Sequence, residues 1–279
     1  MTYMCKSSIP NELSIWDKNK ELEFKISTYI PSIVVNGYAD FKDILKTSHF
    51  KNSENSWVFR GQKEHSWFLQ STLERVNSKS LYLRENHLNR FKKECRRPFK
   101  DNIHLLETDE NEIWAIGQHY GLATPLLDWT YSPYVSLFFA FEEIVENEDY
   151  RVVYALNKDN LLNRLSEYFS HEYNKLFFEP KIDPFGRLIN QSGLFTIAPP
   201  CTTLEDTLID ELRKVCITRE NDIADYICKI YIKSTQYERR ECLSDLRKMN
   251  IHHGTLFPDL IGATKYCNQM IKEQYGVDC

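Results

Sequence analysis

Hydrophobic residues recur along the chain at two spacings, one typical of strands and the other of helices. Runs of β-branched and aromatic residues predict buried strands, whereas alternation of apolar and polar residues predicts a half-buried strand at 21–30. The predicted strands are 21–30, 57–59, 126–127, 151–156, 194–197 and 228–232, and the apolar-rich segment 67–73 is expected to include a further short strand that leads to a turn.

Other segments carry apolar residues three and four positions apart among charged residues, which predicts amphipathic helices. The predicted helices are 38–48, 80–99, 111–120, 133–146, 161–178, 237–250 and 261–275. Because there are no repeats and no Pro/Gly/Ser-rich linkers, we predict a single mixed α+β domain. We place this domain at 51–279, with 1–50 as an N-terminal extension packed on it.

Composition and charge are those of an ordinary globular protein. The 279 residues are 42% hydrophobic and 27% charged, with a net charge of −5, so no global basic character indicates a nucleic-acid partner. The N-terminal residues show no secretory signal, and no apolar run is long enough to span a membrane. The eight cysteines are scattered without a CxxC pair. We therefore expect reduced thiols, no metal site and a cytoplasmic protein.

The stretch from Gln118 to Ser132 places polar groups between two predicted helices. Gly121 and Pro125 indicate a shaped turn, after which a short strand ends in the polar residues 128–130. Ser132 then caps the next helix, with Pro133 at its first position. Many enzymes form a ligand site from a strand, a polar turn and a capped helix in succession. The alternative is a connection whose polar groups only satisfy one another.

Two further polar residues stand beside predicted strands. Strand 57–59 leads directly into Arg60 and Gly61, which places a permanent cation next to a flexible backbone position. An ion pair with an acidic neighbour is the alternative for this arginine. Gln191 precedes strand 194–197, and its amide needs partners if it is buried. Its alternative is an amide that bonds loop backbone.

Several of these segments together carry a resemblance to the FRG domain family. Phe59-Arg60-Gly61 resembles the motif that gives the family its name, and residues 118–130 with Ser132-Pro133 and the apolar 137–140 resemble its second block. Residues 190–196 and 256–260 look like a third and a fourth block. Pro125 departs from the pattern, since most members carry an arginine there.

A more distant resemblance is to the arginine-class mono-ADP-ribosyltransferases. These carry an aromatic-Arg-Gly on the first core strand, a Ser/Thr-rich strand-to-helix turn and a glutamate on a later strand. The first feature is similar to Phe59-Arg60-Gly61, and the second is similar to the turn at 128–130 with Ser132. Gln191 occupies roughly the third place, although it is not a glutamate. The resemblance implies an ADP-ribosyltransferase-like split β core with flanking helices, and NAD as substrate.

The same resemblance implies roles for individual residues. Arg60 would grip the pyrophosphate or ribose, the Gly61 backbone would bond the nicotinamide carboxamide, and Gln62 would adjoin them. Thr130 and Ser132 would support the site, and Trp129 or Tyr120 would stack on the nicotinamide ring. Gln191 would hold the ribose 2′-hydroxyl and steady developing positive charge. Asp128 is the alternative source of a carboxylate. The expected catalytic residues are Arg60, Gln191 and Asp128.

Two functions of different classes fit this resemblance. The first is an NAD-dependent mono-ADP-ribosyltransferase, a bacterial toxin of a toxin–antitoxin or anti-phage defence system. It would modify nucleic acid (RNA favoured) or protein and would have an antitoxin as partner. A nucleic-acid acceptor requires basic residues beside the pocket. The candidates are Lys92, Lys93, Arg96, Arg97, Arg239 and Arg240. The second function is a non-catalytic FRG module that senses a nucleotide or binds a partner.

Overall fold

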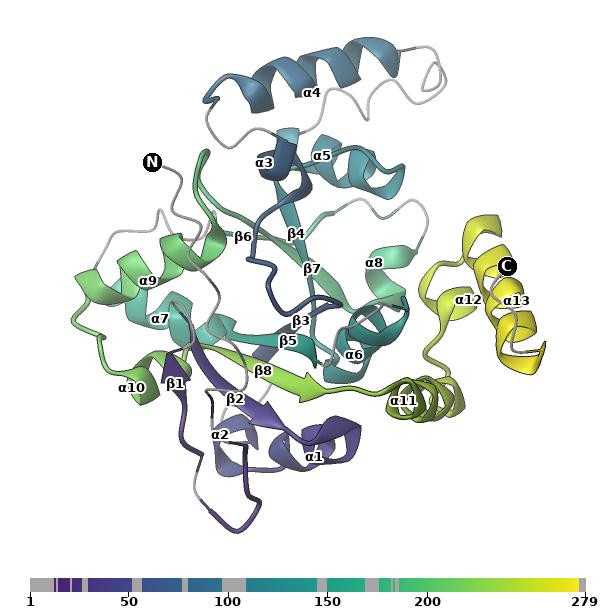
Figure 1. Ribbon diagram of the computed structural model, residues 1–279. Coiled ribbons are helices and arrows are strands. Elements are labelled where there is room, and N and C mark those ends of the chain that lie inside the picture. The colour runs from purple at the N-terminus through teal and green to yellow at the C-terminus, as the bar shows by residue number, and fades with distance from the viewer. Residues whose placement is uncertain are drawn as a thin grey trace.

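Eight strands form one mixed sheet in the order β1-β2-β8-β5-β3-β4-β7-β6 (Figure 1). The computed structural model describes residues 13, 15–20, 22–26, 30–51, 57–76, 80–96, 109–144, 150–168, 176–181, 183 and 186–275. Only β2 and β8 run parallel, and every other neighbouring pair is antiparallel. The strands are β1 Lys25–Ile26, β2 Pro31–Val35, β3 Trp57–Gln62, β4 Leu126–Thr130, β5 Tyr150–Asn157, β6 Phe177–Phe178, β7 Gly193–Ile197 and β8 Ile227–Lys233.

Helices lie on both faces of this sheet (Figure 1). The longer ones are α1 Gly37–Ile44, α4 Leu83–Glu94, α5 Glu110–His119, α6 Pro133–Phe141, α7 Lys158–Tyr168, α9 Leu204–Lys214, α11 Gln236–Lys248 and α13 Leu260–Tyr275. The short ones are α2 Ser48–Lys51, α3 Thr72–Val76, α8 Arg187–Asn190, α10 Glu220–Ala224 and α12 His253–Leu256. Within the described ranges, no helix combines the length and the apolar character that crossing a bilayer demands. The six cysteines in these ranges are free thiols.

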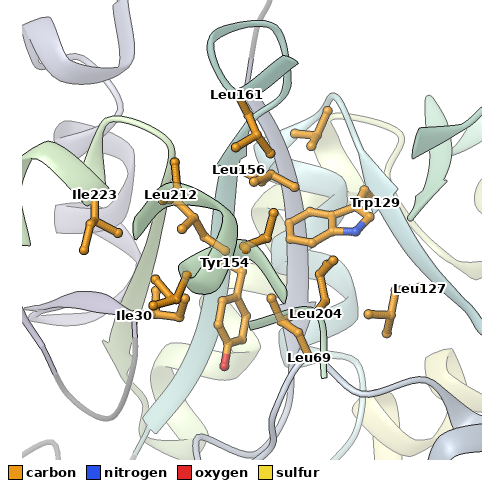
Figure 2. Close-up of a cluster of buried hydrophobic side chains, with 14 of the residues drawn as sticks. Ile30, Leu69, Leu127, Trp129, Tyr154, Leu156, Leu161, Leu204, Leu212 and Ile223 are labelled. Atoms are coloured by element: carbon orange, nitrogen blue, oxygen red, sulfur yellow. The ribbon is translucent and has the colours of Figure 1, made fainter. Parts of the chain in front are cut away.

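Each face of the sheet carries its own hydrophobic core. On one face, side chains of β4 and β5 pack against leucines of α7 and α9, and Figure 2 shows Trp129 and Tyr154 among them. On the other face, α1, α6 and α11 cover β2, β3, β5 and β8. Because both faces are covered, the residues of β5 are buried along its whole length.

The start of α6 follows the sequence prediction in detail. The Ser132 hydroxyl oxygen accepts a hydrogen bond from the Val135 N–H, and Pro133 occupies the first turn, where no N–H is required. This cap fixes where β4 ends and α6 begins. The predicted polar turn is therefore a strand end followed at once by a capped helix.

Three sequence predictions of secondary structure are wrong in whole or in part. The predicted helix 161–178 ends at Tyr168, and Phe177–Phe178 is strand β6, where Phe178 stacks on Phe195 of β7. The short strand expected within 67–73 does not form: residues 67–71 are irregular and lead into α3, and the Trp67 and Phe68 carbonyl oxygens accept hydrogen bonds from the Tyr154 and Gln62 side chains. Of the predicted strand 21–30, only Lys25–Ile26 is a strand among the described residues.

Two elements that the sequence analysis did not identify complete the fold. Strand β2 lies between β1 and β8 within the sheet, so the described part of the first fifty residues contributes directly to the sheet and its core. Helix α9 begins at the N-cap Thr203, whose hydroxyl oxygen accepts from the Asp206 N–H. Its leucines cover the face that holds Trp129.

The sheet divides between β3 and β4. Strand β3 pairs with β5 along its whole length, and β4 does so with β7. In the part of the chain that the structure describes, β3 pairs with β4 only at Phe59 and Thr130. Beyond this pair the two strands diverge, so the edge of β3 from Arg60 to Gln62 has no strand beside it. In an antiparallel ladder alternate residues point their N–H and C=O to one side, so some of these groups face the gap.

Gly61 allows α6 to lie directly against β3. A Cβ at this position would overlap the Ser136 carbonyl oxygen and lie 2.8 Å from Ala140 N, and both atoms belong to the backbone of α6. A glycine is required here for close approach of a helix and a strand. The position of α6, which ends at the cleft described below, depends on this contact.

We predict that Gly61→Ala destabilises the protein by about 1–3 kcal/mol or more, because helix backbone must move to admit one methyl group. The measurement is denaturant unfolding followed by circular dichroism. Gly254→Ala is the matched control, since a Cβ there would meet nothing nearer than 3.4 Å. Equal stability of the two variants would contradict the proposed packing.

Candidate functional site

A cleft of about 440 Å³ opens where β3 and β4 diverge. This volume lies in the range of about 300–1,000 Å³ that is typical of small-molecule sites. Residues from β3, β4, β7, α5, α8 and the end of α6 line it. The polar and aromatic ones are Phe59, Arg60, Gln62, Lys63, Trp67, Arg75, Gln118, His119, Asp128, Trp129, Thr130, Phe139, Glu142, Glu143, Asp183, Arg187, Gln191, Phe195 and Phe257.

Arg60 bridges the two diverging strands. Its Nη1 donates to the Asp128 carbonyl oxygen at 2.7 Å and lies 3.5 Å from the Asp128 carboxylate. Its Nε is buried and has no hydrogen-bond partner among the described residues. Burial lowers the pKa of the guanidinium, and the nearby Asp128 carboxylate opposes this effect. Arginine titrates so far above neutral pH that Arg60 keeps its charge. Arg60 therefore forms the ion pair with an acidic neighbour that was its alternative interpretation, and this ion pair lies inside the cleft.

Asp128 is held from the side of α5 as well. The Gln118 amide Nε2 donates to its Oδ1 at 2.6 Å, and the Gln118 Oε1 accepts from the Thr124 hydroxyl. These contacts fix the carboxylate, whose side chain is 56% exposed, in a defined orientation toward the cleft. The sequence analysis predicted Asp128 as a site residue. The contact from Gln118 depends on how the chain turns between α5 and β4, which the sequence analysis did not predict.

Thr130 and Gln191 also line the cleft and contact each other. The Thr130 hydroxyl donates to the Gln191 carbonyl oxygen at 2.6 Å and accepts from the Ser132 N–H at 3.0 Å. The Gln191 side-chain Nε2 donates to the Leu256 carbonyl oxygen at 3.0 Å. Thr130 thus joins β4, the turn before β7 and the start of α6. The Gln191 amide bonds backbone, as its alternative interpretation expected, and it does so at the cleft wall.

The structure places the remaining predicted residues differently. Trp129 is among the residues that line the cleft, but it is 2% exposed, and its ring lies in the core, where Nε1 donates to the Thr196 hydroxyl (Figure 2). Trp129 follows Leu127 by two positions and shares its face of β4. Tyr120 is 60% exposed and does not line the cleft. Ser132 acts as a helix cap, and the glycine at position 61 is explained by the approach of α6.

Arg187 supplies a second cation that the sequence analysis did not single out. Its side chain forms an ion pair with Asp259, donates to the His119 carbonyl oxygen at 3.2 Å and lies over the Phe257 ring. Burial, followed by the charge of Arg187, lowers the pKa of His119 to about 4, so that imidazole is neutral at pH 7. The predicted block at 256–260 therefore reaches the cleft through Arg187.

Hydrogen bonds from buried polar side chains hold the segment that carries Trp67 at the cleft. The Gln62 amide is 5% exposed and donates to the Phe68 carbonyl oxygen. The Tyr154 hydroxyl lies 2.7 Å from Glu205 Oε1 and 3.1 Å from the Trp67 carbonyl oxygen. The indole of Trp67 remains 40% exposed at the cleft. A buried network thus presents one exposed aromatic face to the cavity.

Glu142 is a largely buried carboxylate at the end of α6. Its side chain is 19% exposed, lines the cleft and lies 3.2 Å from His253 Nε2. Burial raises the pKa of the Glu142 carboxyl to about 7. Burial also lowers the pKa of His253 to about 4, so the imidazole is neutral near pH 7. The residue lies in a predicted helix, but its burial follows from tertiary packing that no local pattern reveals.

The basic residues proposed for nucleic-acid contact do not line the cleft. Lys92, Lys93 and Arg96 belong to α4 and its end, which lies beyond α3 and α5 (Figure 1). Arg239 donates to the Phe141 and Glu142 carbonyl oxygens, and Arg240 is exposed elsewhere. Arg97 lies outside the described residues. No group of three or more potential metal ligands occurs among the residues that the structure covers.

Comparison with known proteins identifies one family. Residues 55–149 match the FRG domain. No curated protein and no solved structure matches the chain. The matched range contains Arg60 and Asp128, whereas the segments at 190–196 and 256–260 lie outside it.

We predict that ionisation of Glu142 weakens folding. A carboxyl whose pKa is raised to about 7 contributes stability that is fully present below about pH 4.5, its unfolded value, and is lost as pH rises through about 7. Glu142→Gln removes this titration. The variant should therefore gain stability relative to wild type between pH 5 and pH 8, on the order of 1–3 kcal/mol.

Denaturant unfolding at several pH values measures this difference. Glu167→Gln on α7 is the matched control, because that carboxylate is 61% exposed and its ion pair lies at the surface. A difference between Glu142→Gln and wild type that does not change with pH would contradict the burial of an ionisable Glu142.

Proposed function

This chain carries an FRG domain at residues 55–149, and we propose that it is an NAD-dependent mono-ADP-ribosyltransferase. The observation that supports this best is the convergence of three segments on one cleft. The first segment is the aromatic-Arg-Gly of β3, the second is the end of β4 at 128–130, and the third is Gln191, two residues before β7. The strands β3, β4 and β7 are adjacent in the sheet. Direct contacts join them: Arg60 to Asp128, and Thr130 to Gln191.

The cations of the cleft suit the pyrophosphate of NAD. Arg60 is held at one side by Asp128, which leaves the rest of its planar fork for phosphate or ribose oxygens. Lys63, which is ion-paired with Glu143, and Arg187 also line the cleft. The exposed ring of Trp67, rather than that of Trp129, is placed to stack on a base or on the nicotinamide.

Two residues are placed to act at the ribose. The Gln191 Nε2 is bonded to Leu256, which leaves its Oε1 to accept from a ribose hydroxyl. Asp128 supplies a fixed negative charge that stabilises positive charge developing on the ribose. In the reaction, the bond from ribose C1′ to nicotinamide breaks with its electron pair on the nicotinamide, and an acceptor lone pair forms the new bond to C1′.

The proposed acceptor is a nucleic acid, RNA first, or a protein, as in a toxin of a toxin–antitoxin or anti-phage system, with an antitoxin as partner. The neutral residue at position 191 favours a nucleobase over a strongly basic side chain. Because the basic side chains of α4 do not line the cleft, an RNA would be recognised through its base. The same neutral residue is the observation that favours a nucleotide-sensing or partner-binding module without catalysis.

We predict that the purified protein transfers label from ³²P-NAD to a lysate fraction, with RNA, DNA and protein assayed separately. Arg60→Ala should lower transfer on the order of 10²-fold, because a preorganised cationic donor is lost. Arg60→Lys should recover only part of the rate, since an ammonium keeps the charge but not the fork.

Arg213→Ala on α9 is the matched control, because its side chain is 58% exposed and does not line the cleft. Unchanged thermal stability of the Arg60 variants would show that the loss is not unfolding. NAD binding without transfer to any fraction and without release of nicotinamide would support the sensing module instead.

A further inference from the structure

Hydrogen bonds to backbone carbonyl groups fix the position of Glu142 at the cleft. It follows the last residue of α6, where carbonyl groups lack partners within the helix. The Arg239 guanidinium of α11 donates to two of these carbonyls, those of Phe141 and Glu142. The backbone of residue 142 is therefore fixed, and its side chain extends into the cleft that Arg60 also lines.

His253 holds the carboxylate from the other side. The imidazole is 8% exposed and packs edge-on against Phe138, with ring centroids 4.9 Å apart. Because burial keeps this ring neutral near pH 7, its Nε2–H can donate to Glu142 Oε2 without bringing a positive charge. The contact orients one carboxylate oxygen and leaves the other for a ligand.

The surroundings leave Glu142 without a bonded cation among the described residues. Lys63 is paired with Glu143, and Arg239 is bonded to backbone. The charged and titratable groups that act on it from the neighbouring elements are Lys63 after β3, Glu143 beside it, Arg239 of α11, His253 of α12 and Lys265 of α13. A buried carboxylate without a cation lowers stability when it ionises. Its position in a cleft is a recognised mark of acid–base function.

Other carboxylates of the cleft are engaged more tightly. Asp128 is bonded by Gln118 and faces Arg60, and Glu143 is bonded by Lys63. Both of these carboxylates therefore already contact a cation. Glu142 contacts one neutral donor and no bonded cation among the described residues, which leaves it free to accept a proton.

We propose that Glu142 is the general base of the transfer reaction and that His253 is its positioning residue. This inference rests on the proposed transferase function. It implies an acceptor whose attacking atom carries a proton, such as a hydroxyl or an amide N–H. As that atom bonds to ribose C1′ and the nicotinamide leaves, its proton passes to the Glu142 carboxylate and then to solvent.

The test is the pH dependence of nicotinamide release and label transfer from NAD. Wild type should lose activity about tenfold per pH unit below an apparent pKa near 7, as Glu142 becomes protonated. Glu142→Gln should lower the maximal rate on the order of 10²–10⁴-fold. It should also abolish the acid limb and keep the Kd for NAD within about threefold, because the base contacts the acceptor rather than NAD.

His253→Phe, which keeps an aromatic ring but removes the N–H donor, provides the second variant. Loss of a donor to the carboxylate raises the pKa of Glu142, so the acid limb should move to higher pH while the maximal rate falls less than in Glu142→Gln. A purely structural role for His253 would change the rate without moving this limb. Glu167→Gln, on the exposed face of α7, should leave both the rate and the profile unchanged.

The outcomes separate this inference from the proposed function. A wild-type protein that neither binds nor turns over NAD overturns both. A wild type that transfers ADP-ribose, together with a Glu142→Gln variant of equal rate and the same pH profile, overturns the general base alone. Loss of activity with an unshifted acid limb in His253→Phe overturns the positioning role.

Discussion

The hydrogen bond from the Arg60 guanidinium to the Asp128 carbonyl is the contact on which the cleft depends. Strands β3 and β4 pair only at Phe59 and Thr130 among the residues described, and they separate on one side of that pair. The side chain of Arg60 spans the separation where backbone hydrogen bonds stop. A sheet that opens this way exposes backbone polar groups and one buried cation to a ligand, which a fully paired sheet cannot do.

Tertiary contacts then shape the two ends of the opening. The segment that carries Leu256 and Phe257 closes one side through Gln191 and Arg187. Helix α6 closes another, and Gly61 permits its approach. The cleft therefore combines three ion-paired cations, Arg60, Lys63 and Arg187, with the carboxyl of Glu142, whose pKa burial raises to about 7. This combination supports the proposed transfer from a dinucleotide.

Local patterns predicted strands at the positions of β3, β4, β5, β7 and β8 and the Ser132 cap, because each is encoded by neighbours in sequence, but they did not identify β2 or β6. The FRG resemblance added the expectation that these segments meet, and the family match at 55–149 confirms that family. The side of β4 on which Trp129 lies follows from simple alternation with Leu127, yet the aromatic residue was assigned to the site. Arg187 and Glu142 acquire their surroundings only from segments distant in sequence, so no local pattern could identify them.

Hydrogen–deuterium exchange with and without saturating NAD tests the central claim most directly. If the opening between β3 and β4 holds the dinucleotide, backbone amides of residues 60–62, 128–131 and 187–191 should exchange more slowly with NAD, while those of α4 should not change. Unaltered exchange in all three segments, or slower exchange confined to α4, would contradict a dinucleotide site in this cleft.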